Sequence, residues 1–207
     1  MDWTLEKIQA KIRKLSGRPD EEALSTTDLD VYINHYYQNV FPLEALPFEL
    51  EEWFTQNTAD GVDTYAVDEK YLAFKEPFSI AGWPITYYLN PKLFYEKYPE
   101  TQTWTEMQPT DVLFFSQNLI FRPPPDTIYQ FKTKAIQRPT ALTLTSDKPP
   151  NQLWGPVIAY GSAIEIKNDN GEFEETQPLA DLYAYYLAFV SRQNTIMLAT
   201  QRSIPRF

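Results

Sequence analysis

Apolar residues near the amino end of the chain recur at the spacing of a helix. The four that share one face are Leu5, Ile8, Ile12 and Leu15. Steps of 3, 4 and 3 residues place such positions along a single stripe of an α-helix. Gly17 and Pro19 follow as a stop signal, because glycine closes helices and proline does not continue them. The pattern predicts a first helix over roughly residues 4–16.

A second helix is expected after a run of hydroxyl and acidic residues, Ser25, Thr26, Thr27 and Asp28. A hydroxyl at this place can accept hydrogen bonds from the free amides of a first turn, and Asp28 meets the positive end of the helix dipole. The predicted buried face consists of Leu29, Tyr32, Ile33, Tyr36 and Val40. Pro42 is expected to end this helix.

The middle of the chain, from about residue 48 to 140, changes to short runs of Tyr, Phe, Trp and Thr. Twelve of the 17 prolines lie between Pro77 and Pro156, a density that helices do not tolerate. The clearest predicted strand covers residues 128–137, where apolar or small side chains alternate with Gln and Lys. Residues 62–67 and 112–121 are further strand candidates, and residues 91–98 read as a short helix capped by Asn90.

Helical spacing returns after Pro149 and Pro150. One predicted helix stops at the NDNG sequence of residues 168–171, and a last one opens at Pro178 and runs to about Thr200. The face of the first of these is Leu153, Val157, Tyr160, Gly161 and Ile164. The face of the last helix is Leu179, Leu182, Tyr183, Tyr186, Leu187, Val190 and Met197.

The order of helices, strands and helices predicts an α+β fold. Because each helix has one apolar stripe that must be covered, we expect a four-helix bundle from the N- and C-terminal helices, with an inserted, mainly antiparallel β domain. The expected divisions are N-terminal helices over 1–47, a β-rich insertion over 48–150, C-terminal helices over 151–200, and an extended tail over 201–207.

Composition narrows the functional classes. The 207-residue chain has no cysteine, which excludes disulfides, thiolate nucleophiles and cysteine metal sites. Its net charge of −10 argues against a protein that holds nucleic acid by the phosphates. No apolar run approaches the roughly 18–20 residues of a membrane helix, so no membrane partner is expected. An aromatic content of 15% favours a subunit with protein contacts over a free monomer.

Candidate catalytic chemistry is sparse. His35, the single histidine, lies in the predicted second helix with no marked nucleophile beside it, which favours a structural role. The acidic run of residues 168–175 lacks the spacing of a calcium loop. The sequence also contains no glycine-rich phosphate loop and no G-x-S-x-G motif. We therefore expect no catalytic residue, no metal site, no cofactor and no enzymatic activity.

The strongest charge pattern is basic and lies in the first predicted helix. Lys7, Lys11 and Lys14 share the face opposite the apolar stripe, and Arg18 follows just beyond the helix end. Two interpretations stay open for this face. It is either a solvated helix surface or a surface that contacts an acidic partner or DNA.

The carboxyl-terminal tail is a second candidate contact. Its anchors are Arg202, Ile204, Pro205, Arg206 and Phe207. A short extended peptide with cationic and apolar side chains can add affinity by docking into a neighbouring subunit. The alternative is a terminus without a binding role.

Five segments follow one another in consistent order along the chain. They are LSGRP (15–19), STTDLDVYINHYYQNVFP (25–42), FSIAGWPITYYLNPKLFYEKYP (78–99), WGPVIAYGSAIEI (154–166) and QRSIPRF (201–207), which together contain 65 of the 207 residues. In this order they resemble the adaptor proteins that form the ring beneath the portal of tailed bacteriophages. The resemblance lies in their sequence along the chain and in the tail, since none of them is a catalytic signature.

This resemblance implies a structural virion protein, assembled in the host cytoplasm as a homo-oligomeric ring, commonly of twelve subunits. Such a ring docks on the portal protein and extends the DNA channel toward a downstream nozzle, stopper or other tail protein. DNA passes through it without sequence-specific binding. In such rings the carboxyl-terminal segment often reaches into the portal, which would give the tail residues 202–207 their role.

Other functions remain alternatives at this point. One is another neck or tail ring, such as a stopper, nozzle or terminator. Another is a non-viral, soluble protein-binding module, for which a stable monomer with one partner patch is expected. A wall-degrading enzyme would need two opposed acids in a cleft, and the sequence marks no such pair.

Overall fold

The computed structural model describes the backbone of residues 2–200 and the side chains of residues 2–193. The protein has an α+β fold with two compact units. The helical unit spans Met1–Leu50 and Arg138–Phe207, and the β unit spans Glu51–Gln137. The expected α+β class with mainly antiparallel sheets is confirmed.

The β unit ends at Gln137, whereas the sequence prediction extended the β-rich insertion to residue 150. Segment 138–150 belongs to the helical unit because side chains of the second helix hold its backbone. Asn34 exchanges two hydrogen bonds with the backbone of Leu142, and Gln38 Nε2 donates to the carbonyl of Pro139. This coil carries no periodic pattern, so its attachment could not be read from spacing.

Helix α1 (Leu5–Ser16) matches the prediction of a first helix. Thr4 caps its start by accepting a hydrogen bond from the amide of Lys7. Gly17 ends it in the left-handed conformation, with φ of 72°, a backbone angle that glycine adopts without steric cost. Its buried residues are Leu5, Ile8, Ile12 and Ser16.

Helix α2 (Thr26–His35) begins as predicted, with Ser25 accepting a hydrogen bond from the amide of Asp28. The prediction that Pro42 ends the helix is wrong. The chain continues through a π-helical turn, η1 (Tyr36–Val40), into helix α3 (Phe41–Ala45). Pro42 lies in the first turn of α3 and has no N–H to donate, and the amide of Phe41 just before it donates to the carbonyl of Tyr36 across the wider π turn.

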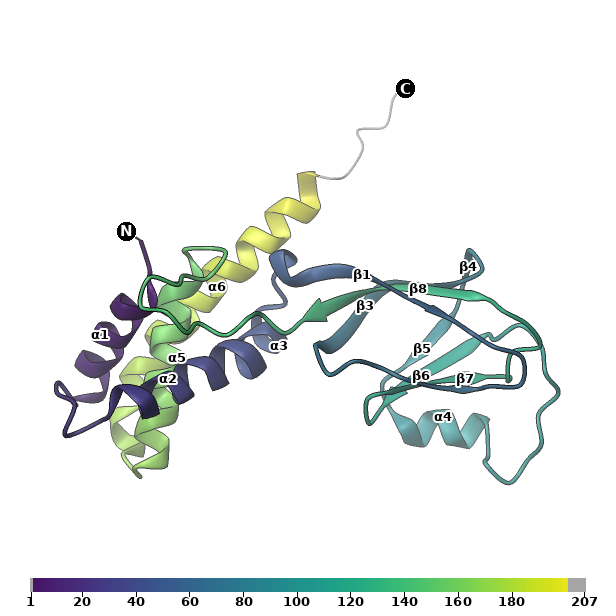
Figure 1. Ribbon diagram of the computed structural model, residues 1–207, viewed down its shortest axis with the longest axis horizontal. Helices are drawn as coiled ribbons and strands as arrows, with labels where there is room; N and C mark the ends of the chain where they lie inside the picture. The colour runs from purple at the N-terminus through teal and green to yellow at the C-terminus, as the bar shows by residue number, and fades with distance from the viewer. Residues whose placement is uncertain (1, 201–207) are drawn as a thin grey trace. The chain divides into compact units, whose positions relative to one another are not determined.

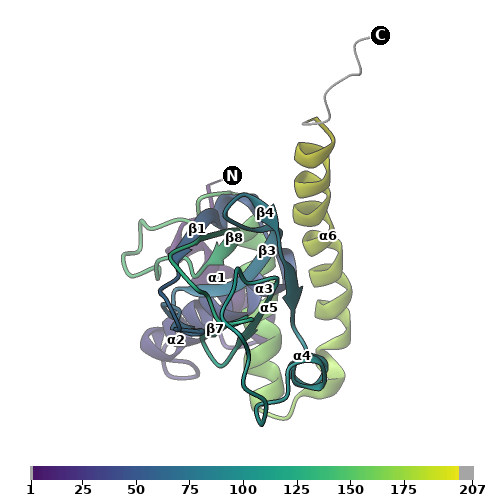
Figure 2. The ribbon, with the colours of Figure 1, turned by 90° about the vertical axis from the view of Figure 1, so that its right-hand side faces the viewer.

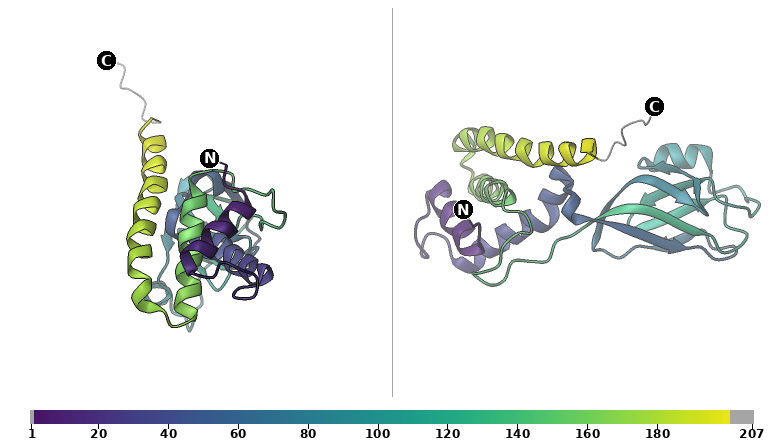
Figure 3. Two further views of the ribbon diagram at one scale, coloured as in Figure 1. Left: turned by 90° about the vertical axis from the view of Figure 1, so that its left-hand side faces the viewer. Right: turned by 90° about the horizontal axis from the view of Figure 1, so that it is seen from above.

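Helix α5 (Trp154–Asp169) is the centre of the helical unit and is buried along most of its length. It packs against α1, α2 and α6 (Gln177–Thr200). Figure 3 shows α1 and α2 on one side of α5 and α6 on the other. Gly161 permits a close approach from η1, because a β-carbon there would lie 2.2 Å from the ring of Tyr36.

The predicted four-helix bundle is not confirmed by this arrangement. Helix α6 packs mainly on α5, with a smaller contact to α3. Leu179 and Val190 are buried, while Leu182, Tyr185 and Phe189 stay exposed on its described part. No helix within residues 2–200 is both long enough and apolar enough to span a bilayer.

The β unit consists of two four-stranded sheets (Figure 1). The first has the order β1 (Glu51–Asn57), β8 (Gln130–Gln137), β3 (Tyr71–Ile80) and β4 (Trp83–Pro84). The second has the order β2 (Thr64–Ala66), β7 (Asn118–Arg122), β6 (Asp111–Phe115) and β5 (Thr86–Tyr88). All pairs are antiparallel except β5 with β6. Helix α4 (Pro91–Lys97), seen along its axis in Figure 2, packs on β5 and β6.

An aromatic core joins the two sheets. Phe54 and Phe74 lie 5.0 Å apart between ring centres, and Phe121 and Phe131 lie 5.2 Å apart, all in edge-on geometry. Edge-on pairs match the negative ring face with the positive ring edge and add to the stabilisation from burial. This core explains why the middle of the sequence is so rich in phenylalanine and tyrosine.

Most predicted elements of the β unit are confirmed. The strand of residues 128–137 is β8, and the short helix capped by Asn90 is α4. The segment 112–121 is two strands rather than one, because Ser116 and Gln117 form a tight turn with φ of 49° and 57°. Positive φ at both central positions gives the twist that closes an antiparallel hairpin.

Candidate functional site

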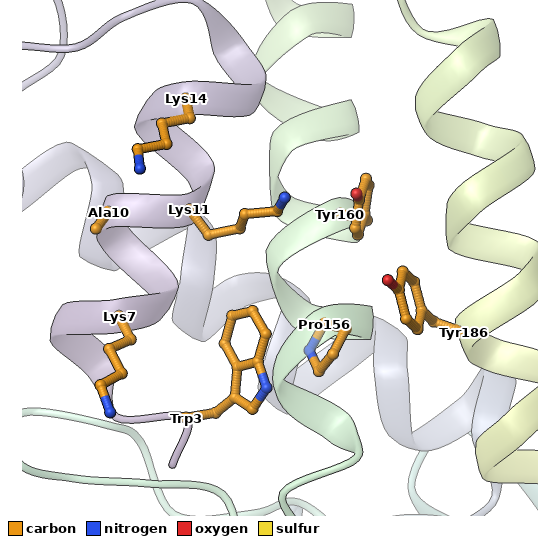
Figure 4. Close-up of a pocket in the computed structure, with 8 residues that line it drawn as sticks. All are labelled: Trp3, Lys7, Ala10, Lys11, Lys14, Pro156, Tyr160 and Tyr186. Atoms are coloured by element: carbon orange, nitrogen blue, oxygen red, sulfur yellow. The ribbon is translucent and has the colours of Figure 1, made fainter. Parts of the chain in front are cut away.

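Three lysines of α1 lie along one cavity of about 400 Å³ in the helical unit (Figure 4). They are Lys7, Lys11 and Lys14, whose spacing of 4 and 3 residues places them on one helix face. We call this cavity the basic groove. The residues that line it are Trp3, Lys7, Ala10, Lys11, Lys14, Pro156, Tyr160 and Tyr186.

The position of the basic groove follows from the two faces of α1. Leu5, Ile8 and Ile12 are buried on the opposite face, which leaves the lysine face toward the opening. Lys11 reaches across to α5, where its Nζ lies 5.3 Å from the ring centre of Tyr160 (Figure 4). This cation–π contact holds one ammonium group over an aromatic wall.

Two stacked tyrosines form the far wall of the groove. The rings of Tyr160 in α5 and Tyr186 in α6 lie 5.5 Å apart with an angle of 26° between their planes. Tyr160 is buried to 6% exposure, so its ring is fixed, while Tyr186 is half-buried at the edge of the opening. Tyrosine rings therefore form one side of the groove, and the lysine side chains of α1 form the opposite side.

Trp3 closes the groove from the amino-terminal side. Its backbone amide donates a hydrogen bond to the side chain of Gln152, and the amide of Leu5 donates to the carbonyl of Asp147 at 2.7 Å. Gly155 of α5 makes room for the indole, since a β-carbon there would lie 2.2 Å from Trp3 Cγ. The segment before α1 is thus held on α5.

The lysines of the groove carry uncompensated charge. Within the part of the chain that the structure describes, no carboxylate lies in ion-pairing distance of the ammonium groups of Lys7, Lys11 or Lys14. The protein as a whole has a net charge of −10, so the groove is a local concentration of positive charge on an acidic molecule. An anionic ligand with an aromatic or apolar part would satisfy both walls.

Arg18, the fourth residue of the predicted basic face, does not line this groove. Its guanidinium bonds Glu172 at 2.5 Å and the carbonyl of Ser16 at 3.0 Å. The left-handed Gly17 turns the chain away from the lysine face before Arg18 is reached. Arg18 therefore joins the end of α1 to the segment after α5.

An apolar surface continues from the groove. A second hollow of about 480 Å³ shares Trp3, Pro156 and Tyr186 with it. Leu153, Tyr185 and Phe189 extend this surface along α5 and α6, and we call these three residues the apolar strip. Tyr185 is 57% exposed and Phe189 is 43% exposed. Exposed aromatic side chains beside a polar rim are typical of protein interfaces.

His35 lies beside a carboxylate of α5. Its Nδ1 lies 3.3 Å from Glu165 Oε2, and the imidazole is largely exposed. Burial raises the pKa of the Glu165 carboxyl, with the nearby His35 opposing that shift. Beside this pair, the hydroxyl of Tyr36 donates to that of Tyr183 at 2.7 Å, and Tyr183 donates to Glu44. Burial raises the pKa of both tyrosines, which keeps their hydroxyls protonated as donors.

Two glutamates of the acidic run at residues 168–175 form ion pairs with a buried lysine. Lys167 Nζ lies 2.9 Å from Glu172 Oε2 and 2.6 Å from Glu175 Oε2. Among the residues with described positions, no group of three His, Cys, Asp or Glu side chains is placed to hold a metal ion. With Arg18, Lys167 and its two glutamate partners form an internal salt-bridge network.

The predicted tail contacts lie outside the described residues. This concerns Arg202, Ile204, Pro205, Arg206 and Phe207. Their proposed role in partner binding stays a prediction from the sequence.

Comparison with known proteins gives no family for this chain. No protein-family model matches it, and no curated protein matches it significantly. The candidate site therefore rests on its own chemistry.

Sequence reasoning found the lysines of the groove but missed its aromatic walls. The spacing of Lys7, Lys11 and Lys14 is visible in any helical projection. Trp3 and Tyr186 reach the same cavity only through the packing of three helices, and no local pattern marks that contact. The one available hint was a tryptophan placed just before a helix start.

Proposed function

We propose that this protein is a structural subunit of a tailed-phage virion, a head-to-tail adaptor that forms a ring on the portal and extends the DNA channel toward the tail. The class comes from the ordered segments that resemble this family. The subunit role is supported by one observation, the continuous surface that the basic groove and the apolar strip form together. Exposed aromatic side chains beside charged ones are typical of protein interfaces.

The charge of the chain supports a channel role. A ring of subunits with a net charge of −10 each would repel DNA phosphates, so that the genome slides through without sticking. In this proposal the lysines of the groove face a neighbouring protein and not the channel. The ring, commonly of twelve copies in this family, would form in the host cytoplasm and remain in the virion, with no membrane partner.

The exposed face of α6 supports an assembled state. Leu182, Tyr185 and Phe189 lie on one long helix without cover from the described part of the chain. A neighbouring subunit in the ring would bury this face, and the predicted four-helix bundle would be completed within the assembly. The tail after Thr200 is proposed to dock into the portal, and the opposite end of the ring would meet a nozzle or stopper protein.

The test is a pull-down with the cognate portal protein, followed by negative-stain imaging. The full chain is compared with a chain that ends at Thr200, after circular dichroism has shown equal helix content. We expect ring-shaped density on the portal with the full chain and its loss on truncation. Absence of binding by either chain would overturn the adaptor assignment in favour of another neck or tail ring.

A second candidate function is a protein-binding module that is not part of a virion. The self-contained groove favours this candidate because its three lysines, which have no ion pair within the described residues, can hold one acidic partner. The two candidates differ in oligomeric state, since an adaptor forms a ring on the portal. A module stays monomeric and binds one partner in a 1:1 ratio, as measured by light scattering after size-exclusion chromatography.

A further inference from the structure

The basic groove needs an occupant with carboxylates and an aromatic ring. Its cations lie on α1 and its aromatic walls on α5 and α6, so a ligand must offer both kinds of contact over a short length. Nucleic acid would supply anions and rings, but the net charge of −10 opposes its approach. An acidic peptide with an aromatic side chain meets the requirements of both walls.

This protein contains such a peptide between α5 and α6. Residues 171–175 read Gly-Glu-Phe-Glu-Glu, and we call them the acidic loop. Phe173 is 65% exposed, and Glu174 has no ion pair with any residue in the described range. Phe173 therefore presents an apolar ring to solvent beside the Glu174 carboxylate, the two kinds of group that the basic groove can bind.

The acidic loop is held in shape by its own contacts. Lys167 bonds both Glu172 and Glu175, and the amide of Glu172 donates to the carbonyl of Lys167 at 2.9 Å. Gly171 permits the turn with φ of 76°. Because these bonds fix the loop ends, Phe173 and Glu174 are presented with little ordering cost on binding.

One copy cannot place its own loop in its own groove. Pro156 and Tyr160 lie in the first turns of α5, whereas the acidic loop follows the end of that helix. At 1.5 Å per residue the two are on the order of 20 Å apart along one rigid helix. In the same copy the Arg18–Glu172 ion pair ties the loop to the end of α1, about one turn beyond Lys14. Phe173 can therefore reach the aromatic walls only in another copy.

We propose that the acidic loop of one copy binds in the basic groove of the next, with Phe173 against the aromatic walls and Glu174 toward Lys7 and Lys14. Two different surfaces meet in this contact, so it is heterologous and repeats around a ring or along a filament. The inference rests on the proposed function in that it names the subunit interface of the ring. The apolar strip lies beside the contact and would be covered with it.

The absence of cysteine from the sequence allows a direct cross-linking test. Ala10→Cys places a thiol in the groove and Gln177→Cys places one directly beside the loop, both at exposed positions. A disulfide requires the two Cα atoms to lie within about 7 Å, which is impossible inside one copy at the separation above. Mild oxidation of the double variant, alone and with portal present, is followed by a non-reducing gel.

We expect a ladder of dimers, trimers and larger species from the double variant, and no species above dimer from either single variant. The matched control pairs Ala10→Cys with Lys148→Cys, an exposed position outside the loop. A ladder no stronger than that of the control would overturn the proposal. Adding Lys7→Glu and Lys14→Glu to the double variant should reduce the ladder about tenfold or more, while Lys92→Glu with Lys148→Glu, a matched charge change, should not.

The outcome separates this inference from the proposed function. Portal binding without a ladder would leave the adaptor role intact and remove this interface. A ladder without portal binding would keep the head-to-tail contact and remove the adaptor role.

Discussion

The indole of Trp3 lies directly against the backbone of Gly155, so that a β-carbon at residue 155 would come within 2.2 Å of Trp3 Cγ. The glycine is required for space, because this part of α5 has ordinary helical backbone angles. A glycine inside a helix costs about 0.5–1 kcal/mol relative to alanine. Packing of the Trp3 indole against Gly155 offsets this cost, and Trp3 forms one wall of the basic groove.

Gly155→Ala should displace Trp3 and open the groove. Overpacking of this kind typically destabilises a protein by about 1–3 kcal/mol. Urea unfolding measures the loss. The exposure of Trp3 is the difference in tryptophan fluorescence between chains with and without Trp3→Ala, because the chain has four other tryptophans. The control is a double-mutant cycle with Trp3→Ala, which removes the clash. The double variant should be no less stable than Trp3→Ala alone, and equal additive losses would contradict the proposed contact.

The sequence predicted the parts of the fold that depend on local pattern. The stripe of α1, the cap of α4 and the alternation in β8 were each visible within about ten residues. The π-helical turn at Tyr36–Val40 was not, because the local pattern marked only a helix end at Pro42 and no wider turn before it. Strand β3 was missed as well, since its residues pair with β8, more than fifty positions away.

Asp111 is predicted to support the β unit above acidic pH. It is buried in β6 and accepts hydrogen bonds from Lys97 at 2.7 Å, Tyr98 at 2.7 Å and Thr110 at 2.6 Å. Burial alone would raise the pKa of this carboxyl, but the three donors together hold it below its ordinary value. A depressed folded pKa contributes stability above the unfolded value of about 3.9, and that contribution is lost as pH falls through the folded pKa.

Asp111→Asn should therefore destabilise the β unit at neutral pH by about 1.5–3 kcal/mol, the scale of hydrogen bonds to a charged group. Hydrogen exchange of amides in β6 and β7 measures the effect at pH 7. The difference from wild type should shrink below about pH 4, where the unfolded carboxyl is protonated. A difference that stays constant from pH 7 to pH 3 would refute the assigned role of the charge.

The charged form of Glu165 is predicted to lower the stability of the helical unit, in contrast to the stabilising charge of Asp111. Burial raises the pKa of its carboxyl, with His35 opposing and Asp169 and Glu44 adding to the shift. A raised folded pKa contributes stability that is present below the unfolded value of about 4.3 and is lost as pH rises through the folded pKa. Glu165→Gln should thus stabilise the helical unit at pH 7, on the order of 0.5 kcal/mol for a partly solvated group.

Thermal unfolding of Glu165→Gln at pH 7 and pH 4 checks this sign. The melting temperature should rise relative to wild type at pH 7, and the gain should be smaller at pH 4. Glu174→Gln is a suitable control, because this exposed residue has no described ion pair and should change neither value. A lower melting temperature for Glu165→Gln at pH 7 would mean that the His35 contact outweighs the burial cost.

The contact between groove and loop should depend on salt. Exposed charges are screened beyond about 8 Å at physiological ionic strength and beyond about 3 Å at 1 M salt. Sedimentation of the wild-type chain on its portal should therefore show fewer bound copies at 1 M than at 0.1 M NaCl. Phe173→Ala should weaken binding at both concentrations, because the aromatic part of the contact is not screened. Binding that rises with salt would contradict the lysine–glutamate pairing.

The most direct test of the central claim is the mass and symmetry of the complex between this chain and its cognate portal. Native mass spectrometry gives the number of chains per portal ring, and electron microscopy of the same sample gives the symmetry. The adaptor account predicts a fixed number of copies, arranged as one closed ring with cyclic symmetry on the portal. A single bound copy, a variable number, or no complex at all would contradict it.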